Sequence, residues 1–139
     1  MLIDTHSHIY LPEFDADRSV MLANAEKEGV ELVLMPAIDT SAHGSLLKSE
    51  ADFAGKCLAM MGLHPCSVKA NFESELEAVK GYFEQRQFVA VGETGLDFYW
   101  DLAFTREQYI SFQSQIELGL QYDIPIVIHS RNSTDECIK

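Results

Sequence analysis

The stretch FVAVGETGLD, residues 88–97, indicates most clearly how this chain is built. Its first four residues form a short apolar run typical of a β-strand, and a glutamate follows almost at once. The glycines at positions 92 and 95 permit unusual φ angles and a close approach of the backbone to a ligand. A carboxylate directly after a buried run usually has a partner, because an unpaired buried charge is costly. We therefore predict a strand over 88–91, followed by a loop that brings Glu93 to a binding site rather than to solvent.

Similar apolar runs recur along the chain and alternate with helical patterns. The predicted strands are 2–3, 31–36, 57–63, 88–91 and 124–128. Helices between them have N-cap signals at Asp15 or Asp17, Asp39, Ser74 and Thr105. Strict alternation of strand and helix is typical of parallel βαβ units. We therefore predict a single α/β domain over residues 1–139, with about five strands and four helices.

The last two of these helices have the most specific sequence signals. Each begins with a predicted capping box, at Ser74–Glu77 and at Thr105–Gln108. The first helix has apolar residues at spacings of 3 and 4, namely Leu76, Val79 and Phe83. The second has a longer apolar stripe, formed by Tyr109, Phe112, Ile116 and Leu120. Both patterns indicate amphipathic helices.

Composition narrows the possible classes of protein. With 47% hydrophobic and 23% charged residues, the chain is globular rather than disordered. It has no apolar run long enough for a membrane helix and no recognisable signal peptide. Its three cysteines are odd in number and far apart, which favours reduced thiols and a cytoplasmic location. A net charge of −12 argues against nucleic-acid binding by bulk charge, but not against a local metal-bearing cleft.

Four of the predicted strands are followed, at their C-terminal ends, by polar side chains that can bind a ligand or take part in catalysis. These are His6 and His8 after the first strand, His64 after the third, Glu93 and Asp97 after the fourth, and His129 and Arg131 after the fifth. In parallel α/β folds these ends share one edge, where ligands bind. Four of the five histidines should therefore converge there. The fifth, His43, lies in a helical pattern, and we assign it and the cysteines structural roles.

His6 and His8 are two residues apart, so an extended backbone would direct both rings to the same face. That arrangement suits a metal ion, because zinc and similar ions accept imidazole nitrogen and a carboxylate can bridge two ions. The pair alone could equally be an exposed pair at a strand end. Glu93 and His129 at equivalent strand ends favour the metal site.

The remaining polar residues each have two interpretations. His64 is either a hydrogen-bonded structural histidine or a contact for substrate phosphate. Asp97 could orient a metal-bound water or a histidine, or could cap the following turn. The guanidinium of Arg131 could donate two hydrogen bonds to a phosphate or form a surface salt bridge. The aromatic residues 98–100 could stack on nucleobases or simply pack.

Four segments together resemble the TatD family of metal-dependent deoxyribonucleases. They are DTHSH at 4–8, GLHP at 62–65, GETGLDFY at 92–99 and PIVIHSR at 125–131. The His-x-His element is shared with the wider amidohydrolase superfamily, whereas the glutamate segment is more specific. The resemblance implies a (β/α)8 TIM-type barrel that hydrolyses DNA phosphodiester bonds, typically as an exonuclease.

The resemblance also implies a role for each matching residue. It implies metal ligation by His6, His8, Glu93 and His129, catalytic roles for Glu93, His64 and Asp97, and substrate contacts for His64 and Arg131. Glu93 would bridge two divalent ions, which could be Mg²⁺, Mn²⁺ or Zn²⁺. Two such ions about 3.5–4 Å apart can activate water and stabilise both the attacking and the leaving oxygen.

The length departs from the family pattern. Such barrels have about 250 residues, and the family has a further histidine and a late aspartate that no residue after His129 supplies convincingly. We therefore expect residues 1–139 to form an incomplete barrel, the N-terminal half, with impaired activity. Because an open strand edge invites pairing, we also expect self-association through that edge.

Two other functions fit the same residues. One is hydrolysis of a small amide, ester or lactone by an amidohydrolase-type site. The other is a non-catalytic, metal-binding half-barrel. For the leading hypothesis, the lack of a Lys/Arg-rich stretch favours DNA ends or single strands as the substrate over long duplexes, and no membrane partner is expected.

Overall fold

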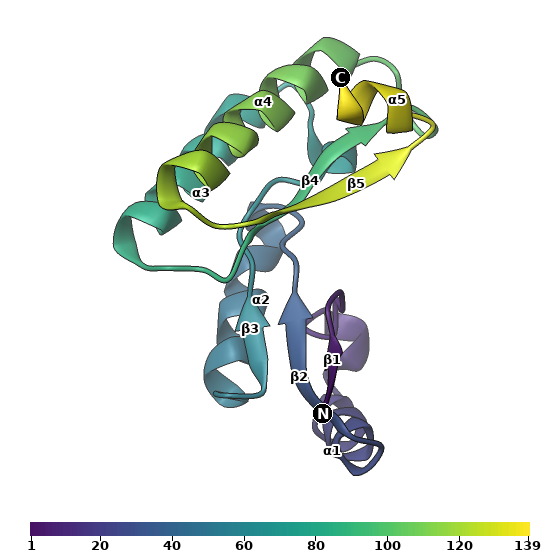
Figure 1. The fold of residues 1–139 in the computed structure, drawn as a ribbon, viewed down its shortest axis with the longest axis vertical. Coiled ribbons are helices and arrows are strands. Elements are labelled where there is room, and N and C mark those ends of the chain that lie inside the picture. Colours follow the sequence, from purple (N-terminus) through teal and green to yellow (C-terminus); the bar gives the residue numbers. More distant parts are fainter.

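The computed structural model describes all residues 1–139 and consists of parallel strands with helices packed along them (Figure 1). The strands are β1 (Leu2–Asp4), β2 (Val30–Met35), β3 (Cys57–Ala59), β4 (Val91–Asp97) and β5 (Ile126–Arg131). The helices are α1 (Arg18–Lys27), α2 (Thr40–Asp52), α3 (Phe72–Gln85), α4 (Thr105–Tyr122) and α5 (Thr134–Ile138), with 3₁₀ turns η1 (Pro12–Phe14) and η2 (Pro65–Ser67). The predicted α/β alternation is confirmed, and α5 adds a fifth helix to the four predicted.

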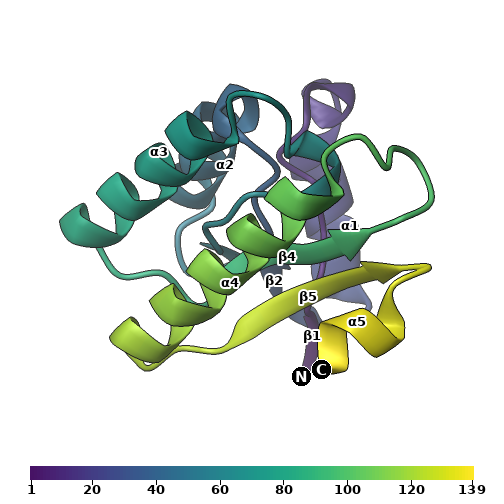
Figure 2. The same ribbon diagram turned by 90° about the horizontal axis from the view of Figure 1, so that it is seen from above.

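The strands form two parallel sheets that continue one another. β1, β2 and β3 pair in that order, and β4 pairs with β5. A parallel bridge between Met61 and Val91 joins the two sheets. Neighbours in space are therefore also neighbours in the sequence, as in successive units of a (β/α) barrel. Figure 2 shows α3 and α4 along one side of the β4–β5 pair, with β5 at its open edge.

The fourth and fifth strands lie later in the chain than the sequence predicted. β4 covers 91–97 instead of 88–91, so the glycine-punctuated segment is a fully buried strand and not a loop. Gly95 explains why: its φ is +134°, and a Cβ atom there would lie 2.1 Å from the carbonyl oxygen of His129. Without a side chain at this position, the pairing with β5 continues to Asp97 and Arg131. Glu93, Asp97, His129 and Arg131 are thus strand residues.

The predicted apolar stripe of α4 is buried only in part, because Phe112 is in the interior at 6% exposure but the two ends of the stripe are not. Tyr109 is 42% exposed and Leu120 is 78% exposed, whereas Gln108 and Gln115 are buried. The amide of Gln115 donates to the carbonyl oxygen of Leu63 (3.1 Å) and accepts from its N–H (2.8 Å). Buried peptide groups require hydrogen-bond partners. Two of the buried positions of α4 therefore hold glutamines that bond to strand and loop backbone.

The predicted capping boxes are wrong, whereas one predicted N-cap is confirmed. α3 begins at Phe72, so Ser74 lies inside its first turn and donates to the carbonyl of Asn71. At the start of α4, Thr105 donates to the carbonyl of Leu102 and no side chain caps the helix. Asp39 caps α2 as predicted, accepting from the N–H of Ser41 at 3.0 Å.

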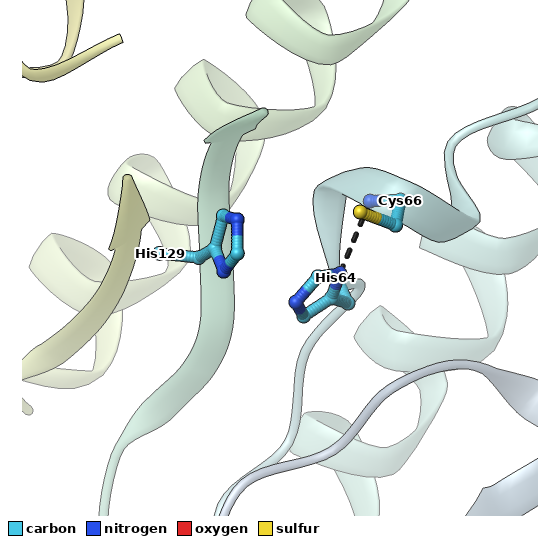
Figure 3. Close-up of side chains that lie close together, drawn as sticks. All are labelled: His64, Cys66 and His129. Atoms are coloured by element: carbon cyan, nitrogen blue, oxygen red, sulfur yellow. Dashed lines mark hydrogen bonds between the residues drawn. The ribbon is translucent and has the colours of Figure 1, made fainter. Parts of the chain in front are cut away.

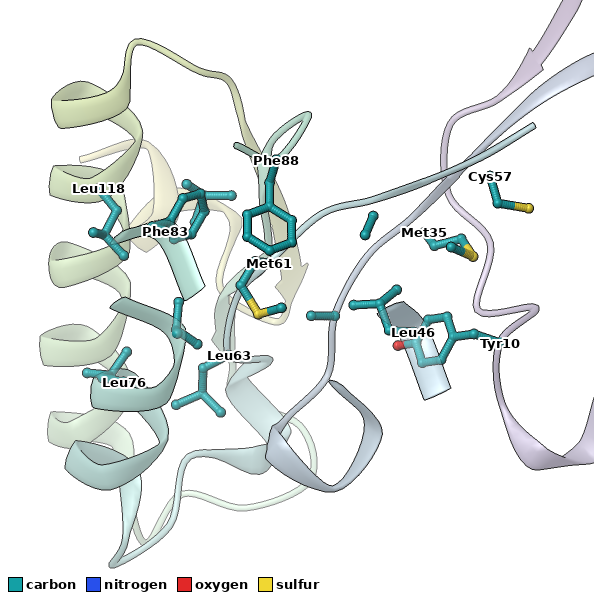
Figure 4. Packing of buried hydrophobic residues seen from close by; sticks show 14 of the residues in the cluster. Tyr10, Met35, Leu46, Cys57, Met61, Leu63, Leu76, Phe83, Phe88 and Leu118 are labelled. Atoms are coloured by element: carbon teal, nitrogen blue, oxygen red, sulfur yellow. The ribbon is translucent and has the colours of Figure 1, made fainter. Parts of the chain in front are cut away.

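The core extends from the first sheet to the helices that cover the second (Figure 4). Leu76, Val79 and Phe83 of α3 are buried in it, as their spacing predicted. His43 is buried at 2% exposure and packs edge-on against Tyr82, with no hydrogen bond to either ring nitrogen. It lies outside the cluster of histidines described below, in agreement with the structural role assigned to it.

None of the helices combines the length and the apolarity needed to cross a membrane.

Candidate metal centre

The carboxylate of Glu93 lies at the centre of the four histidines that the sequence placed at strand ends. Its Oε2 is 3.1 Å from Nε2 of His6 and 3.5 Å from Nε2 of His8. Its Oε1 is 3.1 Å from Nδ1 of His129 and 3.8 Å from Nε2 of His64. The predicted convergence is therefore observed, although His6 and His8 lie in the loop after β1 rather than within the strand.

Backbone pairing holds Glu93 in this position. Its N–H donates to the carbonyl of Ala37, just beyond β2, at 3.2 Å, and the N–H of Ala37 donates to the carbonyl of Gly92 at 2.9 Å. The residue is 93% buried. The carboxylate therefore comes from a rigid strand and has little freedom to move away from the histidines.

The orientation of His8 is set by Tyr10, a residue that the sequence analysis missed. The Tyr10 hydroxyl donates its only proton to the carbonyl of Pro36 at 2.7 Å. It can then only accept from Nδ1–H of His8, which lies 3.2 Å away. The remaining nitrogen of His8, Nε2, consequently faces Oε2 of Glu93. Support of this kind for the second ring nitrogen is usual for metal-ligating histidines.

Asp97, at the end of β4, makes the contacts of two of the three roles that the sequence left open. Its Oδ2 is 2.8 Å from Nε2 of His129, so it orients that imidazole. Its Oδ1 accepts from the N–H groups of Tyr99 (3.0 Å) and Trp100 (3.3 Å), so it also caps the following turn. The buried side chain of Gln108 bonds to both backbone groups of Asp97, at 2.8 and 3.0 Å.

Both carboxylates are ionised at neutral pH. Burial by itself would raise the pKa of Glu93, but a hydrogen bond with His8 and the attraction of the surrounding imidazoles lower it to about 2. Burial likewise opposes ionisation of Asp97, yet the N–H of Tyr99 and the ring of His129 lower its pKa to about 2. The site is thus a concentration of negative charge with nitrogen donors around it, which suits a divalent cation.

His64 caps the short turn η2 and faces His129. Its Nδ1 accepts from the N–H of Cys66 at 3.1 Å, and the centroids of the two imidazole rings are 4.5 Å apart. Burial lowers the pKa of His64 to about 4, so the ring is neutral at pH 7. The hydrogen bond identifies a structural role, and the ring position makes His64 part of the same cluster.

Arg131 forms no salt bridge, contrary to one of its two predicted interpretations. Its guanidinium lies over the ring of Tyr99, 4.3 Å from the centroid, and 5.3 Å from that of Trp100. Both rings are exposed, at 54% and 67%. Tyr99 and Trp100 follow Asp97 in the sequence and Arg131 is the partner of Asp97 in β5, so an exposed aromatic and cationic surface lies beside Asp97.

Two groups of side chains place their ligand atoms within 4.8 Å of one another. One consists of His6, His8 and Glu93, and the other of His64, Cys66 and His129 (Figure 3). Imidazole and carboxylate donors in the first group fit the metals that the sequence predicted. Cys66 is the unexpected member, since we had assigned it a structural role. The signal in the sequence that could have identified Cys66 as a candidate ligand is its position two residues after His64, beside a strand end.

Comparison with known proteins agrees with these features. A family model described as TatD related DNase matches residues 3–139. The metal-dependent hydrolase YabD of Bacillus subtilis is 31% identical over 99% of this chain, and YjjV of Escherichia coli is 33% identical over 96% of it. The 3′-5′ ssDNA/RNA exonuclease TatD of Musicola paradisiaca is 26% identical over 95%.

Solved structures agree as well. The crystal structure of Escherichia coli YjjV superposes on this chain with a TM-score of 0.88 and is 32% identical to it in sequence. The superposition covers 98% of this chain and 53% of YjjV. The chain likewise spans 54% of YabD, 52% of YjjV and 50% of the Musicola exonuclease, about half the length of each curated relative. With a family match from residue 3 to residue 139 and histidines gathered around Glu93, the chain belongs to the family of TatD-related DNases.

Proposed function

We propose that the protein is a metal-dependent hydrolase that cleaves DNA phosphodiester bonds from an end, as an exonuclease with a two-metal site. The observation that carries this proposal is the buried, ionised carboxylate of Glu93, which lies between His6 and His8 on one side and His129 on the other. A carboxylate with separate nitrogen donors near each oxygen is suited to bridge two ions. We assign His6, His8, Glu93 and His129 as metal ligands.

Bound divalent ions would supply positive charge that polarises a phosphodiester and stabilises the charge that develops on its oxygens. The residues of this chain would hold the ions and orient the substrate. Asp97 fixes the ring of His129 through a 2.8 Å hydrogen bond. His64, neutral and close to His129, can contact a phosphate oxygen as a hydrogen-bond donor if its proton lies on Nε2, since its Nδ1 accepts from Cys66.

We propose that Arg131, Tyr99 and Trp100 bind the terminal nucleotides of a single strand. The guanidinium can pair with a phosphate through its forked donors, and the exposed rings can stack on bases, at about 1–3 kcal/mol per base. The net charge of −12 supports recognition at an end rather than along a duplex, which would require a basic track.

The test is hydrolysis of an end-labelled single-stranded oligonucleotide in Mg²⁺ or Mn²⁺. We expect slow turnover by residues 1–139 and its loss in Glu93→Gln, which removes the charge and keeps the shape. Glu84→Gln, an exposed substitution of the same kind on α3, is the matched control and should leave turnover unchanged. Equal turnover by the Glu93→Gln variant and by the wild-type chain would contradict the assignment of Glu93 as a metal ligand.

Two assays separate the alternative functions. Turnover of a small amide, ester or lactone together with no cleavage of DNA would favour an amidohydrolase-type activity. Metal binding without any turnover would favour a non-catalytic half-barrel. Calorimetric titration with Mn²⁺ supplies the stoichiometry, for which we propose two ions in a complete site.

We propose in addition that the chain self-associates through its open strand edges. Leu2 and Ile3 of β1 are 59% and 47% exposed, and Ile128 of β5 is 45% exposed. Apolar side chains beside unpaired strand edges favour pairing with another chain. Sedimentation that shows only monomer at high concentration would contradict this. The proposed location is the cytoplasm, in keeping with the three free thiols.

A further inference from the structure

We propose that Cys66 makes part of this centre a site for a thiophilic divalent cation, Zn²⁺ or Cd²⁺, with His64, Cys66 and His129 as ligands and Asp97 as the fourth. The site shares His129 with the hydrolytic centre proposed above, but it is defined by the thiol, and its test does not require nuclease activity.

The geometry carries this inference. Oδ2 of Asp97 lies 3.3 Å from Sγ of Cys66 and 2.8 Å from Nε2 of His129. Neighbouring ligand atoms around a tetrahedral zinc ion are about 3.3–3.6 Å apart, given its bond lengths to sulfur, nitrogen and oxygen. One ligand atom each from His64, Cys66 and His129 lies within 4.8 Å of the others. Small side-chain rotations would therefore complete a four-coordinate site.

The backbone supports of these ligands are rigid. His64 and Cys66 belong to one tight turn, and Figure 3 shows the two side chains beside the ring of His129. A metal ion bound by His64 would take the place of the hydrogen bond that its Nδ1 accepts from the N–H of Cys66. Gln115 holds the peptide groups of Leu63, directly before that turn. The ligands therefore come from three neighbouring segments: the η2 turn with its N-cap His64, the end of β4, and β5, which pairs with β4.

The thiol determines which ion is preferred. Thiolate ligands select soft ions such as Zn²⁺, whereas Mg²⁺ prefers oxygen. Binding replaces the hydrogen on Sγ with the metal ion. The proton is released to solvent, and nothing is oxidised or reduced. An ion bound in this way occupies His129, so Cys66 would set the metal preference of that half of the centre.

The test is titration of the intact chain with Cd²⁺, followed by the ultraviolet charge-transfer absorption of a cadmium–thiolate bond. We expect one thiolate–Cd²⁺ unit per chain and its loss in Cys66→Ser. Loss of a residue that only supports a metal ligand already weakens metal binding about tenfold. We therefore expect Zn²⁺ binding to be at least about tenfold weaker in Cys66→Ser, as measured by competition with a chromophoric chelator.

Cys57→Ser and Cys137→Ser are the matched controls and should retain the absorption, and circular dichroism should show that each variant is folded. Binding of Cd²⁺ to Cys66→Ser with unchanged absorption and affinity would overturn the proposal. So would an absorption that disappears only in Cys137→Ser. Loss of nuclease activity in Glu93→Gln with retained Cd²⁺–thiolate absorption would separate this site from the proposed hydrolytic function.

Discussion

The two sides of the Glu93 carboxylate are built differently. On one side, His6 and His8 lie in a loop, and their side chains are 42% and 27% exposed. On the other side, His129 lies on a strand and bonds to Asp97, which is only 2% exposed. The loop side is held mainly by a single side chain, Tyr10, whereas the strand side is held by sheet pairing and by two buried glutamines, Gln108 at Asp97 and Gln115 at Leu63, directly before His64. We infer that substitutions on the strand side reduce stability and metal binding together, whereas substitution of an exposed loop-side histidine reduces metal binding with little effect on stability.

The largest effect on stability is expected for Gln115→Met. The substitution keeps the length of the side chain but leaves the N–H and carbonyl of Leu63 without partners. We expect a loss of about 3 kcal/mol in the free energy of unfolding, because each buried unpaired group costs about 1–3 kcal/mol. Urea unfolding measures it, with the exposed Gln113→Met as control. Similar unfolding midpoints for the two variants would mean that these hydrogen bonds do not hold the strand side.

A smaller effect is expected for Tyr10→Phe, on the loop side. The carbonyl of Pro36 loses its donor and Nδ1 of His8 loses its acceptor. We expect a loss of about 1–2 kcal/mol in stability and a loss of about tenfold or more in affinity for Mn²⁺. Calorimetric titration measures the affinity, and an unchanged value would show that Tyr10 does not orient His8. Tyr109→Phe, at an exposed position on α4, is the control.

Asp39→Ala tests the connection between α2 and η2. The Asp39 carboxylate caps α2 and also accepts a hydrogen bond from Ser67 of η2 at 2.7 Å. We expect a loss of about 1 kcal/mol, typical of an N-cap. Burial raises the pKa of Asp39, but hydrogen bonds from Ser41 and Ser67 outweigh it and lower the pKa below the usual value. The stabilisation is therefore complete above the ordinary pKa and disappears as the pH falls through the lowered one. Unfolding curves at pH 7 and pH 3 measure it, and a difference that grows in acid would contradict this sign.

The smallest effect on stability is expected for His6→Ala. Its side chain is 42% exposed, and surface substitutions usually change stability by less than about 0.5 kcal/mol. Affinity for Mn²⁺ should nevertheless fall, since a predicted ligand is lost. A His6→Ala variant that unfolds much more easily than the unchanged chain would show that the loop side is structural as well.

The local patterns of the sequence predicted the residues of the site better than the bounds of the strands that hold them. His6, His64, Glu93 and His129 could be grouped because parallel strands present their C-terminal ends at one edge. The extent of β4 could not be predicted, because it depends on Gly95 lying against the backbone of His129, 34 residues away. The buried face of α4 was mispredicted in part for a similar reason: Phe112 is buried as predicted, but Gln108 and Gln115 are buried because backbone groups of Asp97 and Leu63 need partners.

The sequence by itself therefore determined the α/β alternation, the family and the set of histidines and carboxylates at the candidate centre. These depend on short-range periodicity and on residue type, which a single chain displays directly. Only the tertiary structure decided that Tyr10 supports His8, that glutamines hold Leu63 and Asp97, and that Cys66 joins His64 and His129. Each of these contacts brings together groups whose pairing depends on three-dimensional distance and burial, and hydrogen bonding over such distances leaves no periodic pattern in the sequence.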